Sequence, residues 1–183
     1  MSASEILAYV VAKLDDVGAT YMVVGSMASS YHAAPRSTQD IDIVVSFSRD
    51  ALHGFVEGID REKYYVNEEA ARSASPGTQV NIIDPRGWKV DILVSRDRSF
   101  SHRELERRVP AEILGVSTYV ATPEDTVLTK LEWAKGRESV QHDDVARILL
   151  AIGERLDNAY LDQWAVELGV IDSLNAARRE TAT

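Results

Sequence analysis

Cysteine is absent from this chain of 183 residues. Its absence excludes disulfide bonds, thiol nucleophiles and thiolate ligands for zinc. No apolar run approaches the roughly 18 residues that a membrane-spanning helix needs. Residues 1–5 also lack the basic and apolar regions of a signal peptide. Together these absences predict a cytoplasmic protein that has no contact with a membrane and does not use zinc.

Basic residues are few compared with acids, and the formal net charge is −9. Such an acidic chain argues against a large nucleic-acid-binding surface, which would show an excess of Lys and Arg. Only residues 96–108 form a markedly basic stretch. It contains Arg96, Arg98, Arg103, Arg107 and Arg108. We interpret this stretch either as a solvated loop and helix face or as a local patch that contacts an anion.

Several well-known motifs are missing as well. The chain has no glycine-rich phosphate loop ending in Gly-Lys-Ser/Thr, no Gly-x-Gly-x-x-Gly fingerprint and no His-Glu-x-x-His pair. It also lacks the central glycine and further ligands of an EF-hand. His142-Asp143 suggests a histidine–aspartate phosphohydrolase, but neither His53 nor His102 has a matching helical context.

The apolar pattern predicts one α/β (α+β) fold, a mixed central sheet flanked by helices. We expect helices at 3–16, 26–32, 49–58, 101–108, 123–134, 140–152, 160–168 and 171–180. We expect strands at 21–24, 40–45, 80–83 and 89–94, a short edge strand at 117–120, and a polar loop at 68–77. Residues 1–122 would form the core and residues 123–183 a C-terminal helical region packed on it.

Two acids on one strand are the main chemical signal. Asp40 and Asp42 alternate with apolar residues, so they share one face with Cα atoms roughly 7 Å apart. Gly25-Ser26 follows a buried strand and suits a tight turn into a helix. Asp91 is the single acid inside another apolar strand. It is either an exposed residue on an edge strand or a third metal ligand. Three carboxylates would suit one or two Mg²⁺ ions bound with phosphate.

Lys130 borders the apolar stripe of the helix predicted at 123–134. From composition alone it is either a snorkelling surface lysine or a phosphate contact.

These residues together carry a family resemblance. Val24-Gly25-Ser26, Asp40-Ile41-Asp42-Ile43 and Val90-Asp91-Ile92 resemble the active-site signature of the nucleotidyltransferase superfamily, whose fold is similar to the polymerase-beta palm. Small bacterial members of the abortive-infection toxin type are the most similar. The resemblance spans roughly residues 20–150 and includes residues 34–40, which contain Arg36, and residues 140–145. The roles of His142, Asp143 and Asp144 stay open.

The resemblance implies a Mg²⁺-dependent transfer of a nucleoside monophosphate from a triphosphate, such as ATP, to an acceptor hydroxyl, with release of pyrophosphate. It implies that Asp40, Asp42 and Asp91 are catalytic metal ligands. It also implies that Gly25, Ser26, Arg36 and Lys130 bind the nucleotide. The acceptor would be RNA, a protein or a small molecule, and an antitoxin protein would be a partner. The alternative is a nucleotide- or protein-binding module without turnover.

Overall fold

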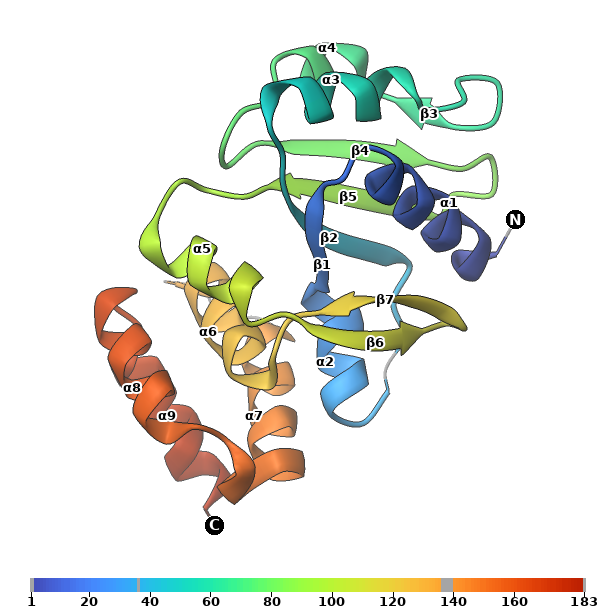
Figure 1. The fold of residues 1–183 in the computed structure, drawn as a ribbon. Helices are drawn as coiled ribbons and strands as arrows, with labels where there is room; N and C mark the ends of the chain where they lie inside the picture. The colour runs from blue at the N-terminus through green and yellow to red at the C-terminus, as the bar shows by residue number, and fades with distance from the viewer. Residues whose placement is uncertain (1, 36, 136–139, 183) are drawn as a thin grey trace.

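One mixed sheet forms the centre of the molecule (Figure 1). The computed structural model describes residues 2–35, 37–135 and 140–182. Within these ranges seven strands lie in the order β3-β4-β5-β2-β1-β7-β6. The strands are β1 Thr20–Val24, β2 Asp40–Ser46, β3 Tyr65–Val66, β4 Gln79–Ile83, β5 Lys89–Val94, β6 Val109–Ile113 and β7 Val116–Val120.

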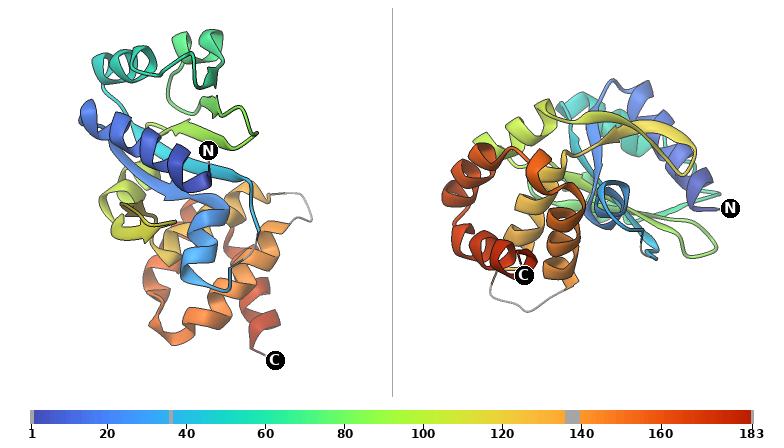
Figure 2. Two further views of the ribbon diagram at one scale, coloured as in Figure 1. Left: turned by 90° about the vertical axis from the view of Figure 1, so that its right-hand side faces the viewer. Right: turned by 90° about the horizontal axis from the view of Figure 1, so that it is seen from below.

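Helices precede, interrupt and follow these strands. They are α1 Ala3–Asp16, α2 Gly25–His32, α3 Arg49–Glu57, α4 Glu68–Arg72, α5 Ser99–Glu106, α6 Pro123–Trp133, α7 Val140–Ile152, α8 Asn158–Glu167 and α9 Ile171–Thr181. The C-terminal helices gather at the end of the molecule opposite α3 and α4, and the turned view keeps this arrangement (Figure 1, Figure 2). Among the described residues, no helix is both long enough and apolar enough to cross a membrane.

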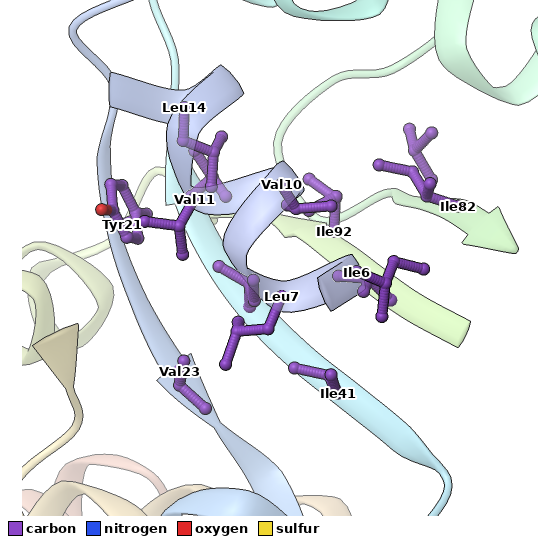
Figure 3. Close-up of a cluster of buried hydrophobic side chains, with 14 of the residues drawn as sticks. Ile6, Leu7, Val10, Val11, Leu14, Tyr21, Val23, Ile41, Ile82 and Ile92 are labelled. Carbon is purple, nitrogen blue, oxygen red and sulfur yellow. The ribbon is translucent and has the colours of Figure 1, made fainter. Parts of the chain in front are cut away.

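Helix α1 packs on the apolar face of the sheet. Its side chains Ile6, Leu7, Val10 and Leu14 have no exposed surface and belong to one cluster with Val23, Ile41 and Ile92 (Figure 3). The side chain of Ser2 caps the first turn, where it accepts a hydrogen bond from the backbone N–H of Glu5. Because strand residues alternate between faces, packing Ile41 and Ile43 under α1 turns Asp40 and Asp42 to the opposite face.

The opposite face is covered only in part. Met22, Val24, Val44 and Ala121 pack there against Leu105 of α5. A second large apolar cluster joins α6, α7, α8 and α9 with Phe100 of α5. The sheet end that carries Asp40 therefore lies beside α2, which itself contacts α6 and α7.

The expected fold class, a mixed sheet flanked by helices, is confirmed. Two local expectations were wrong. Residues 68–77 contain the short helix α4, which Asn67 caps by accepting from the N–H of Ala70. Strand β7 is not an edge strand, because the unpredicted strand β6 pairs with it on its outer side.

Candidate active site

Asp42 and Asp91 face each other across neighbouring parallel strands. Strand β2 pairs with β5 so that Asp42 is the register partner of Asp91 and Asp40 that of Lys89. Register partners point to the same face, with strand axes about 4.8 Å apart. On its other side β2 pairs antiparallel with β1, which puts Val24 beside Asp42. The structure thus brings Asp40, Asp42 and Asp91 to one face of the sheet.

Asp91 is held by two partners within the protein. The Nζ of Lys89 lies 2.9 Å from Asp91 Oδ2 and 3.6 Å from Asp40 Oδ1. Asn81 of β4 donates from Nδ2 to Asp91 Oδ1 over 2.6 Å. The hydrogen bond to Asp91 raises the pKa of Lys89 above its usual value. Each oxygen of the buried Asp91 carboxylate therefore interacts with a side chain of a neighbouring strand position.

The negative charge of Asp42 is only partly compensated by neighbouring lysines. Its burial, and then the negative charges of Asp91 and Asp40, raise its pKa to about 6, although Lys89 and Lys130 act in the opposite direction. Repelling carboxylates of this kind favour a bound cation. Oxygen donors of this type are those that Mg²⁺ prefers.

The three carboxylates are chemically suitable ligands for a divalent cation, although their oxygen atoms do not point at one common position. Among the residues that the structure describes, no three acidic or imidazole side chains are placed together as a metal-binding group. We attribute this to Lys89, whose ammonium lies between Asp40 and Asp91.

Gly25 brings the backbone directly against the Asp42 carboxylate. Its φ is +64°, a left-handed conformation that favours glycine. A Cβ added there would overlap Asp42 Oδ2. The residue at the N-cap of α2 is Val24, whose apolar side chain makes no capping hydrogen bond. The first turn, which includes Ser26, thus offers backbone N–H groups and the positive end of the helix dipole next to the acids.

Lys130 is buried, which excludes the alternative of a snorkelling surface residue. Its side chain is 1% exposed, and Nζ donates to Asp144 Oδ2 over 2.7 Å and to Gln141 Oε1 over 2.8 Å. Asp144, whose role the sequence left open, is therefore the ion-pair partner of Lys130. The positive charge of Lys130 acts on Asp42, which places it near the acidic face. Contact between Lys130 and phosphate stays a prediction.

Arg36 lies outside the described residues. In the basic stretch 96–108, Arg98 forms two hydrogen bonds of 2.6 and 2.7 Å with Glu132. Arg107 lies 3.1 Å from Glu124 and stacks on the ring of Tyr160, at 3.8 Å from its centroid. These arginines are partnered inside the protein, which argues against the solvated-face alternative for both of them.

Sequence reasoning missed Asn81 as a partner of Asp91. A usable signal was the turn at residues 84–87. If Ile83 pairs with Lys89 at this turn, Asn81 must pair with Asp91, and this is the observed register. A polar residue between Val80 and Ile82 in a strand so apolar needs a partner on the open face.

A small pocket of about 90 Å³ lies further along the same strands, lined by Val44, Leu93, Arg98, Glu104 and Thr129, among others. Burial, and then the charge of Asp125, raise the pKa of Glu104 to about 8. Drug-sized ligands need roughly 300 Å³ or more. This pocket is therefore too small to hold a nucleoside triphosphate.

No family model and no curated protein matches the chain. Solved structures do. An antigenic nucleotidyltransferase-like protein from Paracoccidioides brasiliensis aligns over 96% of this chain and 91% of its own, with 17% identity and a TM-score of 0.57. The antibiotic-resistance factor ANT(2'')-Ia aligns over 98% and 97%, with 13% identity and a TM-score of 0.59. The lincosamide antibiotic adenylyltransferase LnuA aligns over 81% and 96%, with 10% identity and a TM-score of 0.55.

This chain has the nucleotidyltransferase fold. The resemblance read from the sequence motifs is thereby confirmed at the level of the fold. The similarity to abortive-infection toxins stays a prediction. Within this nucleotidyltransferase fold, the acids predicted from spacing lie on adjacent strands beside the first turn of α2.

Proposed function

We propose that the protein transfers a nucleoside monophosphate from a nucleoside triphosphate to an acceptor hydroxyl and releases pyrophosphate. The observation that carries this proposal is the pairing of Asp42 with Asp91 across β2 and β5, with Gly25 pressed against the Asp42 carboxylate. Carboxylates and the start of a helix together suit a cation and a phosphate chain. The neighbours support the reaction class, since LnuA is an adenylyltransferase and ANT(2'')-Ia was solved with adenylyl-2''-tobramycin.

Each residue has a defined part in this reaction. Asp40, Asp42 and Asp91 would hold Mg²⁺, which when bound neutralises charge on the phosphates and orients them. Backbone N–H groups of Gly25 and Ser26 would bind phosphate oxygens.

The chemical step is a substitution at the α-phosphorus. The acceptor oxygen forms a bond to this atom, the bond to the pyrophosphate oxygen breaks, and pyrophosphate leaves. Asp91 accepts the proton of the acceptor hydroxyl, in the role of a general base. Lys130 and Arg36 complete the predicted nucleotide contacts. The geometry calls for positioning and charge neutralisation, with no covalent enzyme intermediate.

Asp91→Ala tests the catalytic assignment. We expect the variant to keep most Mg²⁺-dependent triphosphate binding and to lose transfer by about 10²-fold or more, as for removal of a general base. The acceptor is found first, by incubating α-labelled triphosphates with cell extract, purified RNA and hydroxylated small molecules. Asp97→Ala removes a strongly exposed acid and is the matched control.

Two results would change the proposal. Transfer by Asp91→Ala at the wild-type rate would remove Asp91 from the chemistry. Triphosphate binding by the wild type, with no labelled product across all acceptors, would favour the binding-module alternative.

The resemblance extends this proposal to a cytoplasmic toxin with an antitoxin protein as its partner. Growth arrest on expression of the wild type, but not of Asp42→Asn, would support that role. Equal growth of cells that express either protein would contradict it.

A further inference from the structure

Lys89 places a positive charge inside the acidic cluster. It is the first residue of β5, it lies opposite Asp40 in register, and its side chain is 30% exposed. Lys89 and Asp91 are two residues apart on one strand, so both point to the carboxylate face. The ammonium lies 2.9 Å from Asp91 Oδ2 and 3.6 Å from Asp40 Oδ1. A cation that belongs to the chain thus occupies the space between two expected metal ligands.

The contacts of Asp91 set the ammonium of Lys89 against a bound metal. Asn81 Nδ2 donates to Oδ1 over 2.6 Å and the ammonium of Lys89 lies on Oδ2, so a metal that binds this carboxylate lies close to that ammonium. An ammonium and a divalent cation that bind the same oxygen repel each other strongly at such short range. Lys89 in its present position therefore opposes a metal bound to Asp91.

We propose that Lys89 is a built-in counter-ion that competes with the divalent cation for Asp40 and Asp91. It stabilises the acidic cluster in the metal-free protein and lowers the affinity of the site for a free cation. A cation that arrives bound to a triphosphate has an advantage, because the phosphates offset its charge. This inference rests on the proposed function, since it assumes that the carboxylates bind a metal.

The proposal predicts two opposite effects of one substitution. Lys89→Met should bind Mn²⁺ or Mg²⁺ more tightly by about tenfold, which corresponds to roughly 1.4 kcal/mol. The same variant should melt at a lower temperature than the wild type without metal, because the carboxylates lose their counter-ion. A lysine with a purely structural role would change the melting temperature and leave the cation affinity unchanged.

Isothermal titration calorimetry with Mn²⁺ and Mg²⁺, and thermal unfolding with and without these ions, provide the readouts. Lys63→Met is the matched control, because it removes the same charge from an ion pair with Asp60 (3.2 Å) outside the acidic face. We expect no change in its cation affinity. Lys89→Gln serves as a second variant if Lys89→Met does not fold. Lys89→Arg, which keeps the charge, should retain the weak affinity of the wild type.

One outcome is that the wild type binds the cation measurably while Lys89→Met and Lys89→Gln both bind it no more tightly. That result would overturn the counter-ion role of Lys89 and leave the metal site intact. If neither the wild type nor any variant binds a divalent cation, the metal site of the proposed function fails together with this inference.

Discussion

Replacing Asp42 by asparagine should abolish transfer and, in the absence of metal, stabilise the protein. The pKa of this carboxyl rises from its ordinary 3.8 to about 6, through burial first and then through the charges of Asp91 and Asp40. An acid with a raised pKa in the folded state binds its proton more tightly there than in the unfolded chain. Stability therefore falls as the pH rises from about 4 to about 6, and it stays lower above that range.

The magnitude follows from this difference in pKa. One pH unit corresponds to about 1.4 kcal/mol, so ionised Asp42 destabilises the metal-free protein by roughly 3 kcal/mol at pH 7. Asparagine removes the charge but still buries a polar amide, which reduces the expected gain to about 1–2 kcal/mol. A chain of this size shifts its Tm by about 2–4 °C per kcal/mol. The variant should thus melt several degrees higher than the wild type at pH 7. At pH 4 it should melt slightly lower, because Asp42 is then mostly protonated and only the cost of the buried amide remains.

Thermal unfolding in EDTA at pH 4, 5, 6 and 7 measures this effect. Asp97→Asn is the matched control, since the Asp97 side chain is 85% exposed and its replacement should change stability by about 0.5 kcal/mol or less. Added Mg²⁺ should raise the Tm of the wild type but not that of Asp42→Asn. A variant that is no more stable than the wild type at pH 7, or equally stabilised at pH 4 and 7, would refute the electrostatic reasoning. Metal-dependent transfer by the variant at a near wild-type rate would refute the metal assignment.

Substitutions at Gly25, Lys130 and Asn81, two of them with a companion variant, test the neighbouring geometry. Gly25→Ala and Gly18→Ala both place alanine at a φ of +64°, which costs about 1 kcal/mol or more. Only Gly25→Ala should also lose divalent-ion binding by calorimetry, because its Cβ would overlap Asp42 Oδ2, whereas no atom lies within 4 Å of a Cβ at Gly18. Equal losses of binding by the two variants would argue against a specific role for the contact between Gly25 and Asp42. Lys130→Met should lower the free energy of unfolding in urea by about 3–5 kcal/mol, and Asp144→Leu on that background should restore part of it. An unchanged urea midpoint would mean that this ion pair is not buried in solution. Asn81→Ala should lower kcat with little change in KM for the triphosphate, and a changed KM alone would contradict a positioning role.

Most of the secondary structure could be predicted from local patterns. The helix with Ile6, Leu7, Val10 and Leu14 on one side was predicted at 3–16 and is observed at Ala3–Asp16, because its periodicity and its cap are local. The helix start at Thr122-Pro123 and the hairpin around residues 84–87 are equally local signals. Strand β6 could not be predicted in this way. Its residues Val109–Ile113 do not alternate and include a proline, and the strand depends on pairing with β7.

The candidate site likewise has features that the sequence predicts and features that depend on the tertiary structure. That Asp40 and Asp42 share a face follows from the period of a strand, so the sequence alone determined it. That Asp91 lies opposite Asp42 depends on the parallel register of β2 with β5, two strands separated in the chain by α3, β3, α4 and β4. The burial of Lys130 likewise depends on α7, which brings Asp144 to it. Only the tertiary structure decided these contacts, because a side chain's partner across distant elements is set by how the elements pack and not by its sequence neighbours.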